Sequence, residues 1–145
     1  MKMRILFLCT GNSCRSQMAE GWAHHLKADT IDPFSAGVEK HGINPLAVRV
    51  MAEAGVDISA QHSRLISELP CQEFDYVITL CDNAREACPY FPARIKILHH
   101  GFDDPPRLAT AATSEEERLA PYRRVRDEIR AFVAGLPGSI DGSES

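Results

Sequence analysis

The chain lacks the features that mark nucleic-acid-binding and membrane-spanning proteins. It has no block rich in lysine and arginine, and its 145 residues carry a formal net charge of -4. Nucleic-acid surfaces need clustered positive charge, so no nucleic-acid partner is expected. The longest apolar runs are far shorter than the roughly 20 residues that cross a bilayer, so no membrane partner is expected either.

Glycine and cysteine are used in ways that exclude two further classes of protein. Gly11 is the only glycine in the loop that follows the first apolar run, and no Gly-Lys-Ser/Thr follows it. A glycine-rich nucleotide-binding loop is therefore a poor fit. The five cysteines are an odd number and are not expected to form a disulfide framework in a reducing compartment. The apolar run 5–8 is too short for a signal peptide, so a cytoplasmic protein is expected.

Apolar runs alternate with amphipathic segments along the chain. Strands are predicted at 3–8, 30–35, 74–80 and 95–98, and helices at 16–28, 44–54, 63–69 and within 114–135. This alternation predicts an α/β fold, a four-stranded parallel sheet with helices on both faces. One domain is expected over residues 1–136, followed by a small, polar, disordered tail at 137–145.

Three local signals set the expected helix ends. Asn44-Pro45 is a helix start with Asn as cap, and Gly55 ends that helix. Ser114 and Glu117 resemble a capping box for the last helix. Pro121 either kinks that helix or restarts it, and the sequence leaves both open.

The most informative segment follows the first predicted strand and leads into the first predicted helix. It reads Cys9-Thr10-Gly11-Asn12-Ser13-Cys14-Arg15-Ser16. Such a loop surrounds a tetrahedral oxyanion with backbone N–H groups at a helix N-terminus. Arg15 adds a planar fork for two of the anion's oxygens. The same positive field favours a thiolate at Cys9, so residues 10–16 are the predicted anion-binding set and Cys9 the predicted nucleophile.

Two side chains in this loop have further expected roles. Ser16 either donates its hydroxyl to the Cys9 thiolate or only caps the helix. Asn12 is expected to hold the shape of the loop, because Asn tolerates a left-handed backbone.

A second pair of cysteines, Cys81 and Cys88, flanks a polar segment after the third strand. If that segment is helical, the two sulfurs lie roughly 10 Å apart and need local unwinding to form a disulfide. The spacing alone is compatible with a redox pair or with two unrelated thiols. A zinc site with His99 and His100 is disfavoured because the gap between the cysteines is wide for a structural zinc motif.

An acid is predicted beyond the fourth strand. Asp104 is favoured over Asp103 as a group that protonates a leaving oxygen, although turn chemistry before Pro105 explains the local sequence equally well. Ligands of parallel sheets bind beyond the carboxyl ends of the strands. Cys9, Cys81 and Asp104 each follow a strand, so they are expected at the same edge of the sheet.

With these residues in place, the chain resembles the thioredoxin-coupled arsenate reductases, which share the fold of the low-molecular-weight protein tyrosine phosphatases. The similarity extends to about residue 134. It rests on 9–21, 35–37, 41–42, 44–45, 77–81, 88–89, 101–105 and 124–129. The loop alone would not separate reductase from phosphatase, but the phosphatases lack the Cys81 and Cys88 pair.

The resemblance implies a relay of three thiols. Cys9 attacks arsenate, Arg15 neutralises the anion and Asp104 protonates the leaving oxygen. Cys81 and then Cys88 carry the disulfide to the surface, where thioredoxin reduces it. Phosphate and sulfate are expected as substrate analogues. No metal and no cofactor are implied, and a monomer is expected.

The chain departs from the family pattern at Arg64. Some members bind potassium through equivalents of Asn12, Ser35 and an aspartate, and Arg64 stands at the aspartate position. Arg64 is therefore expected to replace the charge of the ion. The long stretch from 107 to 121 has no functional account.

Two other functions remain open from the sequence. A phosphatase would use the same loop and the same acid, although Pro106-Arg107 stands where tyrosine phosphatases usually carry an aromatic residue. A redox-sensing binding module would use the Cys81 and Cys88 pair but would need neither Arg15 nor Asp104. The reductant is also open, since glutaredoxin or a mycothiol-type system would leave similar cysteines.

Overall fold

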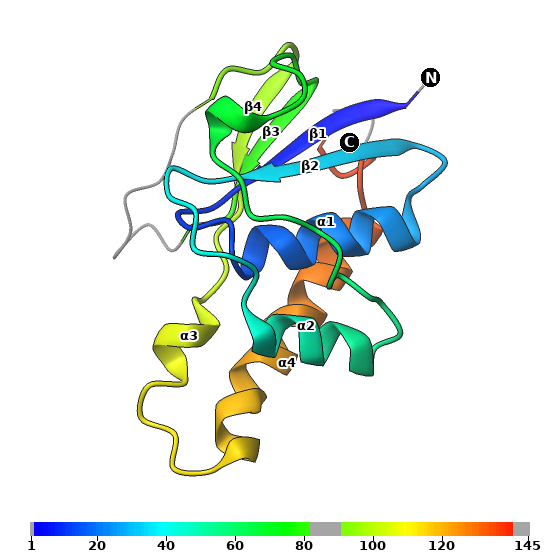
Figure 1. Ribbon diagram of the computed structural model, residues 1–145. Helices are drawn as coiled ribbons and strands as arrows, with labels where there is room; N and C mark the ends of the chain where they lie inside the picture. Colours follow the sequence, from blue (N-terminus) through cyan, green and yellow to red (C-terminus); the bar gives the residue numbers. More distant parts are fainter. Residues whose placement is uncertain (1, 82–90, 141–145) are drawn as a thin grey trace.

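The computed structural model describes residues 2–81 and 91–140 (Figure 1). The elements are, in order, β1 (Met3–Leu8), α1 (Arg15–Leu26), β2 (Ile31–Ala36), α2 (Pro45–Glu53), the 3-10 helix η1 (Ile66–Glu68), β3 (Tyr76–Thr79), β4 (Lys96–His99), α3 (Pro105–Leu108) and α4 (Glu115–Ala134). The predicted α/β class is confirmed. None of the described helices combines the length and apolarity needed to cross a membrane.

The four strands form one parallel sheet in the order β2-β1-β3-β4. Leu8 at the end of β1 pairs with Ala36 of β2 and with Thr79 of β3, and Thr79 pairs with His99 of β4. All four carboxyl ends therefore meet at one edge, as the arrowheads in Figure 1 show. The four-stranded parallel sheet is confirmed, and the loops that carry the predicted site start from this edge.

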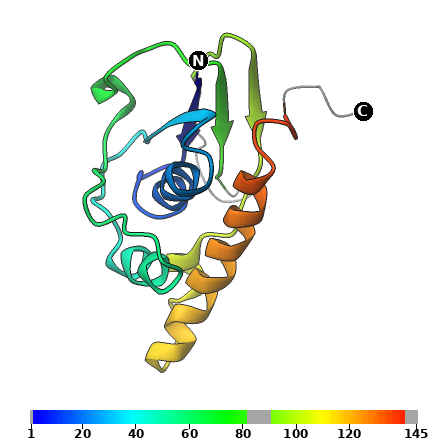
Figure 2. The same ribbon diagram turned by 90° about the vertical axis from the view of Figure 1, so that its right-hand side faces the viewer.

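Both faces of the sheet are buried at the central strands β1 and β3, which explains the continuous apolar run in β1, whereas the edge strand β4 is largely exposed. Ile5 and Phe7 pack into the larger core beneath α1, α2 and α4, whereas Leu6 and Leu8 face a smaller core on the opposite side. Figure 2 looks nearly along α1 and shows α4 crossing beside it. The helices are distributed unequally. On the smaller face the described residues contribute η1 together with Leu69, Phe74 and the segment around Phe91.

The predicted helix ends are largely confirmed. The Asn44 side chain accepts hydrogen bonds from the N–H groups of Leu46 and Ala47 at 2.8 and 3.3 Å, and Gly55 follows α2 with φ +87°. Ser114 accepts from the N–H of Glu117 at 3.1 Å. The other half of the predicted capping box is displaced by one residue, because the Glu117 carboxylate accepts from the N–H of Thr113.

The sequence left open whether the last helix is kinked or restarts at Pro121. One continuous helix, α4, contains this proline, so the helix does not restart there. A buried stripe on α4 packs against the core on both sides of the proline: Leu119, Tyr122, Val125, Ile129 and Val133. Burial of these side chains outweighs the loss of one backbone hydrogen bond.

Three segments differ from the sequence-based expectation. Of the helix predicted at 63–69, only the short 3-10 helix η1 forms. A short helix, α3, was not predicted; it begins with Pro105-Pro106 after Asp104, because proline suits the first turn of a helix. The described chain also continues in turns to Ile140, whose side chain is only 6% exposed and packs in the larger core. The ordered part therefore extends beyond residue 136, while the domain boundary itself stays a prediction.

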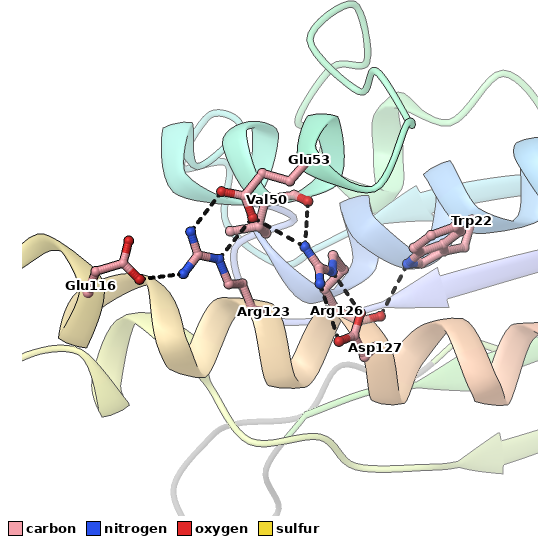
Figure 3. A network of polar contacts seen from close by, with 7 residues as sticks. All are labelled: Trp22, Val50, Glu53, Glu116, Arg123, Arg126 and Asp127. Carbon is pink, nitrogen blue, oxygen red and sulfur yellow. Dashed lines mark hydrogen bonds and ion pairs between the residues drawn. The ribbon is translucent and has the colours of Figure 1, made fainter.

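A network of charged groups joins α1, α2 and α4 (Figure 3). Arg123 on α4 donates two hydrogen bonds to Glu53 on α2, at 2.9 and 2.8 Å, and one to Glu116. Arg126 donates to the carbonyl of Val50, and its own carbonyl accepts from the indole of Trp22 at 3.2 Å. Hydrogen bonding from Arg123 lowers the pKa of Glu53.

This lowered pKa predicts a pH-dependent effect of Glu53→Gln. A carboxyl with a depressed folded-state pKa stabilises the fold above its unfolded-state pKa, about 4.3 for Glu. That contribution disappears as the pH falls through the folded-state value. Glu53→Gln should therefore lower the melting temperature by a few degrees at neutral pH, but not in acid that protonates the wild-type carboxyl. Circular dichroism melts across this pH range measure it, with the exposed Glu73→Gln as control. A difference that persists in acid would contradict the ionic origin.

Candidate active site

The loop between β1 and α1 is shaped by the segment that follows β2. The carbonyls of Thr10, Gly11 and Ser13 accept hydrogen bonds from the N–H groups of residues 39, 41 and 44, at 3.0, 3.1 and 3.0 Å. Asn12 has φ +47°, which confirms its predicted left-handed backbone. Because these carbonyls point outward, the peptide N–H groups between them are left to face the inside of the loop, as anion binding requires.

Gly37 lets this outer segment come close to the loop. A Cβ at this position would lie 2.6 Å from the Thr10 carbonyl oxygen and 2.7 Å from that of Cys9. Both obstacles are backbone atoms, so a side chain here would displace the loop itself. The backbone N–H of Gly37 donates to the carbonyl of Arg64 at 3.0 Å.

A chain of hydrogen bonds leads from Arg64 to the Cys9 sulfur. The backbone N–H of Arg64 donates to Oδ1 of Asn12 at 2.7 Å, which fixes the orientation of that amide. Nδ2 of Asn12 then donates to the Ser16 hydroxyl at 2.8 Å. The Ser16 hydroxyl lies 2.9 Å from the Cys9 sulfur; either group can donate when Cys9 is a thiol, and the hydroxyl is the donor when Cys9 is a thiolate. Hydrogen bonding of this kind stabilises a thiolate.

Ser16 was expected either to bond to the Cys9 sulfur or only to cap the helix, and its hydroxyl lies beside the sulfur. The N-cap of α1 is Cys14, not Ser16. Ser16 lies inside the helix with its hydroxyl buried behind the loop, so the capping alternative is wrong.

Arg15 connects the loop to the ends of β3 and β4. Its guanidinium donates to the carbonyl of Phe102 at 3.0 Å and approaches that of Leu80 at 3.4 Å, and the side chain is 4% exposed. Nη2 of Arg15 lies 3.6 Å from Oδ1 of Asp104, which is 27% exposed. Asp103 points elsewhere and pairs with Arg124 at 2.8 Å. The preference for Asp104 over Asp103 thus agrees with the geometry.

A cavity of about 370 Å³ lies inside this loop. Predicted residues in its lining are Cys9, Thr10, Gly11, Ser13, Cys14, Arg15 and Asp104. The side chains of Asn12 and Ser16 are fully buried behind the loop instead. Three further lining residues, His41, Asn44 and Pro106, were not predicted as site residues. His41 and Asn44 belong to sequence segments that carried the family resemblance, but no local pattern marks them as part of the pocket.

Cys14 lies in the pocket but is poorly suited to attack. Burial raises the pKa of its thiol well above the ordinary value, and a negative charge at Cys9 raises it further, against the opposing effect of Arg15. Cys14 is therefore a neutral thiol at physiological pH, which leaves Cys9 as the nucleophile of the loop.

Cys81 lies at the same edge of the sheet as Cys9. It follows β3, the strand adjacent to β1, and its side chain is fully buried. The carbonyl of the preceding Leu80 accepts from Arg15 at 3.4 Å, so the backbone next to Cys81 adjoins the anion pocket, although Cys81 is not among the described lining residues. Cys88, the third cysteine of the predicted relay, lies outside the described residues.

The two histidines of the disfavoured zinc site have other partners. Nδ1 of His99 lies 2.8 Å from the Thr79 hydroxyl, and His100 stacks on Phe102 with ring centroids 4.7 Å apart. Within residues 2–81 and 91–140, no group of three or more His, Cys, Asp or Glu side chains is placed to hold a metal ion. Ser35, which the resemblance linked to potassium binding in some relatives, donates to Glu20 at 2.5 Å.

Comparison with known proteins agrees with this geometry. The family described as low molecular weight phosphotyrosine protein phosphatase matches residues 4–143. An arsenate reductase of Halalkalibacterium halodurans is 52% identical over 128 residues, which is 88% of this chain and 90% of the relative. A solved structure described as an arsenate reductase in the phosphate binding state superposes with a TM-score of 0.76 at 33% identity, covering 97% of this chain and 99% of that chain.

A thioredoxin-dependent arsenate reductase of Corynebacterium glutamicum shares the fold, with a TM-score of 0.67 at 24% identity. The superposition covers 99% of this chain and 64% of that chain. The family model matches nearly the whole sequence, and the relatives are similar along most of it. The chain is a member of the low molecular weight phosphotyrosine protein phosphatase family, and its half-identical relatives there are arsenate reductases.

Proposed function

We propose that this chain is an arsenate reductase that converts arsenate to arsenite through a thiol relay regenerated by thioredoxin. One observation carries the proposal. The Cys9 thiol, Arg15 and Asp104 line a single cavity, and a second buried thiol, Cys81, follows the adjacent strand. The first three groups suit attack on a tetrahedral oxyanion, and the fourth supplies what a phosphatase does not need.

The first step forms a bond between the Cys9 sulfur and arsenic. The Cys9 thiolate attacks arsenate while loop N–H groups and Arg15 hold the oxyanion. The oxygen of an As–OH group takes a proton from Asp104, its bond to arsenic breaks, and it leaves as water. Arsenic is still pentavalent in this adduct.

The second step transfers two electrons. The Cys81 thiolate attacks the Cys9 sulfur, the sulfur–arsenic bond breaks, and its electron pair stays on arsenic, which leaves as arsenite. A Cys9–Cys81 disulfide remains. Cys88 then attacks Cys81 and releases the Cys9 thiolate, and thioredoxin reduces the Cys81–Cys88 disulfide by the same exchange chemistry.

Several further expectations accompany this proposal. A monomer is expected. Free thiols at Cys9 and Cys81 suit the reducing cytoplasm. A relative with the same fold is named as thioredoxin-dependent, which favours thioredoxin over glutaredoxin or mycothiol.

A weak phosphatase activity is the second candidate function. Phosphate and arsenate are nearly isosteric, and the same loop and acid would serve both. Pro106 and Asn44 line the cavity near Asp104, and the described lining includes no Phe, Tyr or Trp to stack on an aryl ester. Slow hydrolysis of p-nitrophenyl phosphate is therefore expected beside arsenate reduction.

The test is NADPH consumption with arsenate, thioredoxin and thioredoxin reductase. Steady arsenate-dependent turnover is expected, with p-nitrophenyl phosphate hydrolysed far more slowly. Replacing thioredoxin by glutaredoxin with glutathione, or by mycothiol with mycoredoxin, identifies the reductant. Phosphoester hydrolysis without arsenate-dependent turnover in any of these systems would instead make the protein a phosphatase.

A further inference from the structure

His41 forms part of the wall of the anion cavity. Its backbone N–H donates to the Gly11 carbonyl, and its ring lies on the α-carbon of that glycine. A Cβ at Gly11 would lie 2.3 Å from Nδ1 of the ring, so only glycine leaves room for the imidazole here. Nε2 lies 2.6 Å from Oε1 of Glu39, and the His41 side chain is 54% exposed. The ring therefore stands at the mouth of the cavity, held by a carboxylate on its outer side.

The negative charges that meet inside the cavity favour a positively charged side chain at its mouth. A doubly charged oxyanion there meets the Cys9 thiolate, and the guanidinium of Arg15 is already 3.6 Å from Asp104. Among the described lining residues, His41 is the only side chain besides Arg15 that can carry positive charge. A protonated imidazole at this place would present a charged donor to the oxyanion.

We infer that His41 is a further substrate-binding residue, whose imidazolium supplies a second positive charge to the oxyanion at the mouth of the cavity. Glu39 orients the ring from outside, and Gly11 provides the space for it. This inference rests on the proposed function for the identity of the anion as arsenate. The binding step itself is shared with phosphate.

Titration calorimetry with inorganic phosphate tests the inference without any redox step. His41→Gln should raise the phosphate dissociation constant about tenfold, the effect of losing one charge-assisted contact. His41→Lys keeps the charge and should stay within about threefold of wild type. His24→Gln is a matched control, because His24 is 56% exposed beside the carboxylate of Glu20 and lies away from this cavity.

The arsenate kinetics add a second readout. His41→Gln should raise KM for arsenate about as much as the phosphate dissociation constant, with kcat within about twofold of wild type. Unchanged phosphate binding in His41→Gln would overturn the inference. Equal losses in the Gln and Lys variants would overturn it too, because they would show that the ring only shapes the wall. Wild-type protein that binds phosphate but reduces no arsenate would contradict the proposed function and leave the role of His41 in binding to be judged by the titrations.

Discussion

Replacing Arg15 by alanine should lower kcat/KM for arsenate by about a hundredfold to a thousandfold, the scale seen when a preorganised oxyanion donor is removed. Arg15 is 4% exposed and lies beside the carboxyl of Asp104. Its guanidinium is already oriented by the Phe102 carbonyl, so it needs little rearrangement to meet the anion. Arg15→Lys keeps the charge but loses the planar fork, and should recover only part of the loss. The measurement is steady-state arsenate reduction with thioredoxin in excess.

A control separates catalysis from folding in this experiment. Arg15 also joins the loop to the ends of β3 and β4, so thermal unfolding of each variant must be followed. Arg94→Ala removes an equally charged but exposed side chain that pairs with Asp75. It should keep activity within about twofold. An Arg15→Ala variant that folds and retains full function would favour the redox-sensing module, which has no use for this arginine.

The part of the site that could be predicted from the sequence is the part that is local. The loop 9–16 is contiguous with β1 and α1, so the order of an apolar run, a loop and an amphipathic segment was enough to place it. The parallel topology then put Asp104 and Cys81 at the same edge, because the carboxyl ends of parallel strands coincide. No distance was needed for either inference.

The rest depends on backbone contacts that leave no side-chain pattern. Asn12 is oriented by the N–H of Arg64, 52 positions away, and any residue except proline offers that N–H. The wall that contains His41 is attached to the loop in the same way, through N–H groups of residues 39, 41 and 44. Helix α3 was missed for a different reason, since Asp-Pro-Pro is equally typical of a turn.

The predicted relay implies that substitutions of Cys81 and Cys88 differ in how much arsenite they release. Cys88→Ser should release at most one equivalent of arsenite per protein and then stop, because Cys81 can still displace arsenite but the Cys9–Cys81 disulfide has no internal acceptor. Cys81→Ser should release essentially none, because no second thiol is in place to attack the Cys9 adduct. Rapid-quench assays of arsenite, with thiol counting by mass spectrometry, measure both. Each variant should lose steady turnover by about a thousandfold or more, as expected when a nucleophile is removed.

Cys71→Ser provides the matched control for these two variants. Cys71 is half-buried against the smaller core, on the face of the sheet opposite α1, and it takes no part in the cavity. It should turn over arsenate at the wild-type rate, although burial of a hydroxyl in place of a thiol lowers stability slightly. Steady turnover by Cys88→Ser would contradict the third thiol and imply that thioredoxin attacks the Cys9–Cys81 disulfide directly. Because Cys81 is fully buried, that attack would require the chain around it to open first.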